Sequence, residues 1–184
     1  MQFLIGFGVV LVLIVIFFIS QYNGFVRMKN IVEEAFSTMD VYLKKRYDLI
    51  PNVVETVKGY ASHEREALEG IMAARNQTAN AATPEDRLRA EGEVSGVLTR
   101  LFALTESYPD LKANVNFMDL QNQLKSIETE IAQSRKYYNG TVRQYNTKCE
   151  VFPSNIIAGM FNFTKKPLFE VANEAERENV KVQF

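Results

Sequence analysis

The chain has 184 residues, a formal net charge of −1, one cysteine and one histidine. The near-neutral charge provides no broad positive field for nucleic acid, and a single cysteine and a single histidine exclude a disulfide framework and a Cys/His zinc site. We therefore expect no metal, no cofactor and no nucleic-acid partner. An unpaired cysteine also fits a reducing compartment.

The first predicted element is a membrane anchor over residues 1–22. Residues 3–19 carry no charged or polar side chain. As a helix at ~1.5 Å per residue they span about 26 Å, and interfacial residues such as Tyr22 complete the ~30 Å that a bilayer core requires. No basic residue precedes Phe3 and no small-residue cleavage motif follows Ile19. These features favour a retained anchor over a cleaved signal peptide.

Basic residues near the anchor predict its orientation. None lies before the apolar run, whereas Arg27 and Lys29 follow it, and Lys44, Lys45 and Arg46 come soon after. Positive charge favours the cytoplasmic side of a membrane. We expect a single-pass protein with its N-terminus outside and its soluble part in the cytoplasm.

The next predicted element is a long helix that continues the anchor. Residues 23–37 contain no helix breaker except Gly24, and a stripe of side chains spaced by threes and fours follows. Because the stripe keeps its phase across Pro51, the pattern predicts one helix, kinked at Pro51, that continues to about Asn80. The stripe consists of Met39, Leu43, Arg46, Ile50, Val53, Val57, Ala61, Glu64, Leu68, Ile71 and Arg75.

Two further long helices are expected. Thr83 and Pro84 start the first, which runs to about Ser107. The second begins with Asn116 as its cap, shows the heptad-like spacing of coiled coils, and ends at Phe152–Pro153. The linker 109–116 is expected to extend along the bundle, with Leu111 and Val115 packed against it, because the two helices differ in length. A short helix within 153–163 and a polar tail over 164–184, whose last residue docks, complete the chain. The fold class is all-α: one N-terminal transmembrane helix leading into a long antiparallel three- or four-helix bundle over residues 23–163.

Three charged residues lie on the apolar stripe and form a predicted structural polar layer: Arg46, Glu64 and Arg75. Each should meet a polar group on another helix, because a buried charge requires a partner. A catalytic reading of His63–Glu64 is weaker, since a zinc protease needs a second histidine where Ala67 stands. Cys149 is expected to be a buried, inert thiol.

Two apolar surfaces are candidates for contacts. The membrane-proximal stalk carries Phe25, Ile31, Val32 and Phe36. The next helix is too short to cover them and the last long helix reaches them only if the linker extends as predicted, so neighbouring copies are expected to cover them. Near the C-terminus, apolar residues flanked by lysines suit a membrane-surface or subunit contact, or alternatively close the end of the bundle. They are Ile156, Ile157, Met160, Phe161, Phe163, Lys165 and Lys166.

Several strings are similar to a known family. They are RYDLIPNVVETVKGYASHE (46–64), AAR (73–75), ESYPDLKANVNFMDLQNQL (106–124), RKYYNGTVRQYN (135–146) and FP (152–153). Together they closely resemble the bacterial LemA family. The resemblance covers essentially the whole chain and implies an antiparallel helical bundle on one anchor with an external N-terminus. It implies no known reaction, only associations with the cell envelope and membrane organisation.

The function expected from the sequence is not enzymatic. The first hypothesis is a membrane-anchored helical scaffold in the bacterial cytoplasmic membrane that forms a homo-oligomer and organises or remodels the envelope membrane. The alternative is a cytoplasmic-side adaptor or regulator of another membrane protein, such as a membrane protease. The lipid bilayer is a partner in both.

Overall fold

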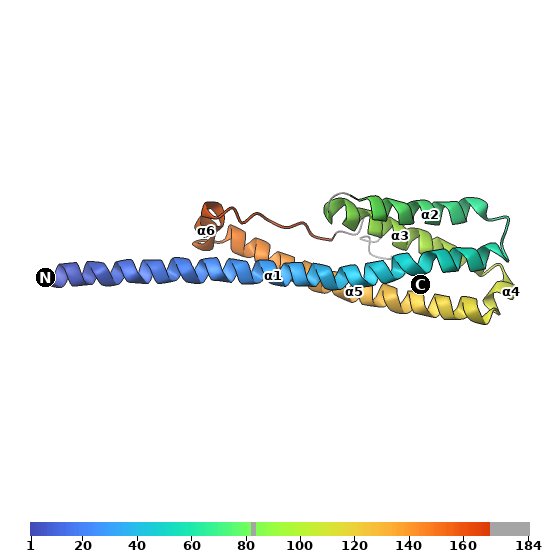
Figure 1. Ribbon diagram of the computed structural model, residues 1–184, viewed down its shortest axis with the longest axis horizontal. Helices are drawn as coiled ribbons and strands as arrows, with labels where there is room; N and C mark the ends of the chain where they lie inside the picture. The colour runs from blue at the N-terminus through green and yellow to red at the C-terminus, as the bar shows by residue number, and fades with distance from the viewer. Residues whose placement is uncertain (82–83, 170–184) are drawn as a thin grey trace, which may run out of the picture. The chain divides into compact units, whose positions relative to one another are not determined.

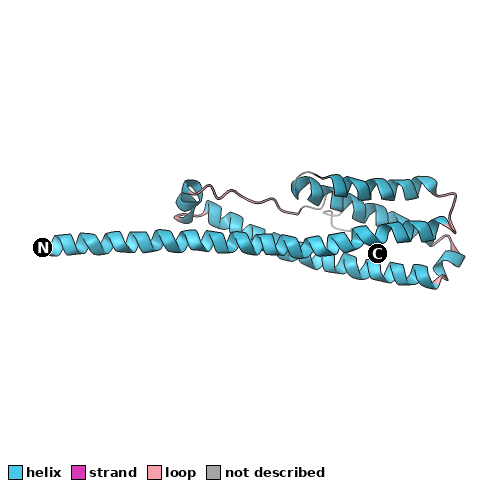
Figure 2. Ribbon diagram, viewed as in Figure 1, coloured by secondary structure: helices cyan, strands magenta, loops and turns pink. Residues whose placement is uncertain are grey.

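The computed structural model describes residues 1–81 and 84–169, and these are helical with no strand (Figure 2). The elements are α1 Gln2–Lys58, α2 Arg65–Asn80, α3 Pro84–Thr105, α4 Pro109–Lys112, α5 Val115–Glu150 and α6 Ser154–Met160. The predicted all-α fold with long helices and a leading apolar helix is confirmed. The expected Thr83 cap and the expected docking of Phe184 lie outside the described residues.

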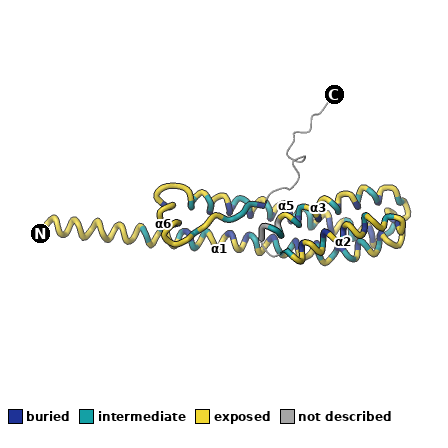
Figure 3. Tube along the Cα trace, turned by 90° about the horizontal axis from the view of Figure 1, so that it is seen from above, coloured by how far each residue is buried: buried dark blue, intermediate teal, exposed yellow. Residues whose placement is uncertain are grey.

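Helix α1 contains 57 residues and passes through Pro51 without a break. Its N-terminal part is exposed around its whole circumference (Figure 3). Among the described helices α1 is the one that is long and apolar enough to cross a membrane. The predicted continuity between the apolar stretch and the stalk is therefore confirmed.

The chain forms two compact units, and each takes part of α1 and part of α5. Unit 1 comprises Met1–Thr38 and Lys136–Leu168, and unit 2 comprises Met39–Arg135 with the segment that begins at Phe169. Each unit has its own buried side chains, so we describe the two separately.

Unit 2 is a bundle of four long helical segments. Helices α2 and α3 run antiparallel, and they pack with the C-terminal part of α1 and the N-terminal part of α5 (Figure 1). Residues at helical spacing on each segment face one another, which is how amphipathic helices bury their apolar faces. The core consists of Ile50, Val53, Val57, Ala61, Leu68, Ile71, Ala74, Val94, Leu98, Leu101, Leu111, Phe117 and Leu124.

The predicted single helix from Met39 to Asn80 is wrong, because the chain turns between α1 and α2. The backbone N–H groups of Tyr60 and Ala61 both donate to the carbonyl of Val57, at 3.0 and 2.8 Å, and this closes the last turn of α1. The turn folds α2 back so that Ala61 and Leu68 reach the core that Val57 occupies. The stripe therefore keeps its spacing across a chain reversal.

The predicted extended linker before α5 is also wrong. Residues 109–112 form the short helix α4, and the cap of α5 is Asn114, whose side-chain oxygen accepts from the N–H of Phe117 at 3.0 Å. Asn116 is not the cap. Leu111 is fully buried as expected, but Val115 remains 72% exposed. The chain therefore turns directly into α5 and does not climb along the bundle.

In unit 1 the stalk of α1 pairs antiparallel with the second half of α5. Phe36 meets the ring of Tyr138 at 5.8 Å between centroids, and Phe25 meets Tyr145 at 6.2 Å. The chain then returns past α6 along α5, where Asn146 exchanges two hydrogen bonds of 2.8 Å with the backbone of Lys166. Because α5 is long enough to cover it, the stalk is not a bare helix, and the expectation that its apolar face lacks cover within the chain is wrong.

Candidate functional site

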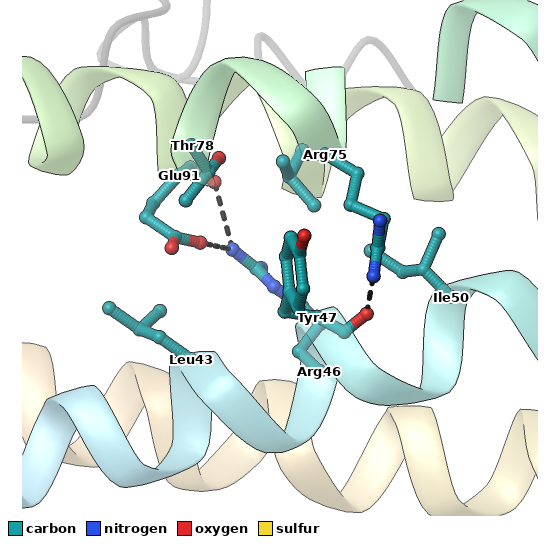
Figure 4. Close-up of a pocket in the computed structure, with 8 residues that line it drawn as sticks. Leu43, Arg46, Tyr47, Ile50, Arg75, Thr78 and Glu91 are labelled. Carbon is teal, nitrogen blue, oxygen red and sulfur yellow. Dashed lines mark hydrogen bonds and ion pairs between the residues drawn. The ribbon is translucent and has the colours of Figure 1, made fainter. Parts of the chain in front are cut away.

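A buried arginine links the helices of unit 2. Arg46, on α1, is fully buried; it reaches Glu91 on α3 (Figure 4) and Glu128 on α5. One terminal nitrogen donates to Ser95 Oγ and to Glu128 Oε1, both at 2.7 Å. The other donates to the backbone carbonyl of Glu91 at 3.1 Å and forms an ion pair with the carboxylate of Glu91. A single side chain thus links three helices.

Burial dominates the electrostatics of this cluster. It raises the pKa of Glu91 above its ordinary value, and the positive charges of Arg46, Arg87 and Arg135 limit the rise. The Glu91 side chain is almost completely buried, whereas that of Glu128 is 31% exposed. A buried carboxylate without its cation would be costly, so the arginine is required wherever Glu91 is charged.

The space beside Arg46 is small. A cavity of about 10 Å³ lies between α1, α2 and α3, lined by Leu43, Arg46, Tyr47, Ile50, Arg75, Thr78, Glu91 and Val94 (Figure 4). This volume holds about one water molecule. The cluster therefore has the geometry of an internal polar layer that fixes how the helices pack.

Arg75 has a different partner from Arg46. Its Nε donates to the backbone carbonyl of Tyr47 at 3.0 Å, and its guanidinium lies 3.6 Å from the centre of the Tyr47 ring. Pro51 has no N–H, so the Tyr47 carbonyl four residues earlier has no helical donor. Arg75, from α2, supplies the missing hydrogen bond at the proline in α1.

This arrangement predicts coupling between Arg75 and Pro51. We expect Arg75→Leu to lower the free energy of unfolding by about 1–3 kcal/mol, because the partly buried carbonyl loses its donor. In a Pro51→Ala background the new N–H bonds this carbonyl, so the same substitution should cost clearly less. Chemical denaturation of the four proteins in this double-mutant cycle measures the coupling.

The exposed Arg65→Leu on the same helix is the matched control and should change little in either background. An equal cost of Arg75→Leu in both backgrounds would show that the Tyr47 carbonyl is not the group that Arg75 serves.

Glu64 lies apart from this pair, at the turn between α1 and α2. Its carboxylate accepts a hydrogen bond of 2.9 Å from the hydroxyl of Tyr108, and this bond raises the pKa of Tyr108. Glu64 thus meets a polar group on another segment. The structure does not bring it together with Arg46 and Arg75 into one layer.

The stalk residues singled out for self-association mostly face their own chain. Phe25 and Val32 are buried, and Phe36 is partly buried against Tyr138. Phe25 also stacks on Phe163 with 4.8 Å between ring centroids. Ile31 is the exposed member, at 36%. Of the four, Ile31 is the side chain that unit 1 leaves most accessible to a neighbour.

The C-terminal candidates divide into an inner and an outer set. Ile157 is buried and Phe163 packs on α1, whereas Ile156, Met160 and Phe161 are exposed. Lys165 pairs with Glu150, and the backbone of Lys166 is bound by Asn146. The segment therefore closes this end of unit 1 with one face and leaves the other uncovered.

Cys149, which the sequence predicts to be a buried thiol, is only partly buried and lies beside Tyr145. Burial raises the pKa of the Cys149 thiol, which reduces its thiolate fraction at neutral pH, and burial also raises the pKa of neighbouring Tyr145 to about 12. Across 1–81 and 84–169, no three His, Cys, Asp or Glu side chains gather as a metal site.

Sequence reasoning missed the carboxylates that hold Arg46. Glu91 lies three residues before Val94, and Val94, Leu98, Leu101 and Thr105 continue the same buried stripe. Extending that stripe backwards by one step would have found Glu91. Glu128 has no comparable signal, because it lies beside the stripe of α5 and remains partly exposed.

The described residues form a helical fold that begins with a candidate membrane span and encloses a buried arginine cluster, which defines a class: helical-bundle proteins with a candidate membrane-spanning helix. Within that class the chain belongs to the LemA family, whose sequence pattern matches residues 35–184. The resemblance noted in the sequence is confirmed.

Three relatives illustrate this membership. The chain is 24% identical over 164 residues to Protein LemA of Metamycoplasma hominis, covering 89% of this chain and 74% of that protein. It is 24% identical over 192 residues to magnetosome protein MamQ 2 of Paramagnetospirillum magneticum, covering 88% and 71%. It is 21% identical over 177 residues to magnetosome protein MamQ of Magnetospirillum gryphiswaldense, covering 82% and 65%. None of these three names denotes a reaction.

Proposed function

We propose that this protein is a non-enzymatic helical scaffold that is anchored in the bacterial cytoplasmic membrane, self-associates, and organises or remodels the envelope membrane. The observation that carries the proposal is α1, a single helix of 57 residues. It includes the candidate span and contributes one helical segment to each unit. Within unit 1 this helix carries the candidate span directly into the stalk without an intervening turn, which suits a structural role at a membrane.

The buried polar cluster supports a structural role. Arg46 directs its terminal nitrogens at Ser95, Glu91 and Glu128 within the chain, beside a cavity with room for about one water. Its charge is used to hold helices together. Two of the relatives are named after a bacterial structure, the magnetosome, which favours organisation over metabolism.

Self-association rests on the anchor and on the exposed part of the stalk. Anchored copies share one membrane plane and one orientation, which raises their effective concentration for side-by-side contacts. Such contacts close into symmetric rings when the rotation between copies permits it. Ile31 offers an exposed apolar side chain on the stalk. Phe25 and Val32 are not available for contacts between copies, because they are buried within unit 1.

The test measures assembly of the full chain in membranes and in detergent. Chemical crosslinking of membranes followed by a mass measurement in mild detergent should give a multiple of the monomer mass. Ile31→Asp should lower that mass, whereas Ser37→Asp, the same charge at an exposed position on another face of α1, should not. A monomeric wild type in both settings would contradict the scaffold and favour the adaptor for another membrane protein.

The orientation of the protein gives a separate prediction. Arg27 and Lys29 follow the apolar stretch, and Lys148 packs over the ring of Phe25, which adds positive charge on the same side. The folded part should therefore lie in the cytoplasm. A protease site inserted near Asn173 should be cut only after cells are permeabilised, and cutting in intact cells by added protease would reverse the assigned orientation.

A further inference from the structure

The end of α5 lies level with the end of the apolar run of α1. In unit 1 the two helices are antiparallel, and Phe25 on α1 meets Tyr145 on α5. Ser20 lies five residues before Phe25 on α1, and Glu150 lies five residues after Tyr145 on α5. Both are displaced by about 7.5 Å in the same direction, at the rise of an α-helix. The apolar run ends at Ile19, so the chain leaves α5 at the height where the candidate span meets water.

Helix α6 lies at the same height. Phe161, directly after α6, packs on Tyr22 with 4.8 Å between ring centroids, and Phe163 packs on the same ring at 5.8 Å. Figures 1 and 3 both show α6 beside α1, at the point where the exposed N-terminal part of α1 ends. Tyrosine at the end of an apolar span is typical of the bilayer interface, so α6 lies at that interface.

The face of this segment that points away from unit 1 is apolar. Ser154, Ile157 and Ala158 form the buried face of α6. Phe152, Ile156 and Met160 are spaced by four residues and are exposed by 79%, 50% and 60%. Val151 and Phe161 are also about half exposed. Five apolar side chains exposed within eleven residues form a patch of the kind that marks a membrane or protein contact.

Charge at this end of unit 1 favours an anionic surface. Residues 148–166 contain three lysines, Lys148, Lys165 and Lys166, against one acid, Glu150. Lys165 is paired with Glu150, which leaves the segment with an excess of two positive charges. Apolar side chains beside a basic surface are the composition of helices that bind anionic bilayers at the interface.

We propose that residues 151–161 are a second membrane contact, in which Phe152, Ile156 and Met160 enter the headgroup region of the bilayer that holds the N-terminal span. The occupant is the lipid surface because the chain's own span sets the height of this segment and brings a bilayer beside it in every copy. The inference goes beyond self-association and does not depend on it, since one copy has both contacts.

The test places a fluorescent probe on the segment in the full chain, reconstituted in vesicles of phosphatidylcholine and phosphatidylglycerol. In a Cys149→Ser background, an environment-sensitive dye is attached to Phe152→Cys or Met160→Cys. Tyr137→Cys, at an exposed site on α5, is the matched control. We expect blue-shifted emission at the two test positions and several-fold stronger quenching by nitroxide-labelled lipids than at the control, while soluble iodide should quench the control more strongly.

Further conditions separate the bilayer from other sources of protection. Quenching by nitroxide lipids should persist at a lipid excess that leaves one copy per vesicle. Loss of protection on this dilution would assign the face to contacts between copies and overturn the proposal. Equal access of iodide to all three positions would also overturn it. Vesicles of phosphatidylcholine alone should give weaker lipid quenching than vesicles that also contain phosphatidylglycerol. Equal quenching in the two kinds of vesicle would contradict the part of the proposal in which the lysines contact anionic lipid.

Discussion

Arg46→Met is expected to lower the free energy of unfolding by about 3–5 kcal/mol, the cost of leaving one charge of a buried pair without its partner. Most of this cost arises at Glu91, because its buried side chain on α3 loses both the hydrogen bond and the positive charge of Arg46. Glu128 is partly exposed and can turn towards water. Thermal and chemical unfolding of the full chain in detergent, followed by circular dichroism, measures the change.

A second substitution distinguishes the loss of an ion pair from a loss of packing. Arg46→Met combined with Glu91→Leu removes both charges and should recover most of the stability, because apolar residues often replace buried ion pairs at little cost. Lys44→Met is the control: Lys44 pairs with Asp48 on the exposed side of α1, and its loss should cost less than about 1 kcal/mol. A double variant as unstable as the single one would show that Arg46 acts mainly through packing.

The difference in free energy of unfolding between wild type and Arg46→Met should also depend on pH. Burial already raises the pKa of Glu91 above 4.5, and removing Arg46 removes the main influence that lowers it. A carboxyl whose folded pKa is raised binds its proton more tightly in the native state, so its contribution to stability is lost as the pH rises through the folded pKa. The variant should therefore be closest to wild type near pH 4.5 and below, and the gap should widen towards neutral pH.

Phe25→Ala should release the C-terminal segment of unit 1. Phe25 is fully buried between the stacked ring of Phe163 and the edge of Tyr145, and the ammonium of Lys148 lies 4.9 Å from its centroid. Truncating a buried phenylalanine costs about 3–5 kcal/mol, from lost burial and the cavity left behind. Because the cost falls on unit 1, amide hydrogen exchange over residues 154–168 should accelerate strongly.

Tyr137→Ala is the matched control, since this aromatic residue in the same unit is exposed and its loss removes little packing. Amides in the core of unit 2, such as those of Leu98 and Leu101, should keep their protection in both variants. Unchanged exchange over 154–168 in Phe25→Ala would mean that the segment is held by its hydrogen bonds to Asn146 and Tyr138, and not by the aromatic stack.

Helical periodicity allowed much of the fold to be predicted. The stripe from Met39 to Ile71 and the length of α5 follow from spacing, because buried positions on a helix must recur every three or four residues, and the continuity of α1 follows from the lack of helix breakers other than Gly24 in residues 23–37. The same rule led to the wrong prediction of a continuous helix across the turn at residues 59–64. Ala61 and Leu68 face the core from opposite sides of a chain reversal, yet their positions in the sequence fit one straight helix.

Partners distant in the sequence were harder to predict. Arg46 was identified as a buried charge needing a partner, but Glu128 lies 82 residues away and carries no pattern of its own. The cover of the stalk was also missed. Cover by the last long helix was expected only with an extended linker, yet α5 follows the short helix α4 and still places Tyr145 against Phe25, and the returning segment adds Phe163. Asn114 and Asn116 were equally good caps by residue type, and only the backbone decides between them.

Within unit 1, α1 runs unbroken from the candidate span into the stalk, and this fixes rotation as well as position. Each residue of an α-helix turns the chain by about 100° and advances it by about 1.5 Å. Inserting one residue near Asn23 would therefore turn the rest of unit 1 about the axis of α1 relative to the candidate span, and removing one would turn it the other way. A flexible tether would absorb such changes, but a continuous helix passes them on in full. The number of residues between the apolar stretch and Phe25 thus determines which face of unit 1 would lie towards the bilayer or towards a neighbouring copy.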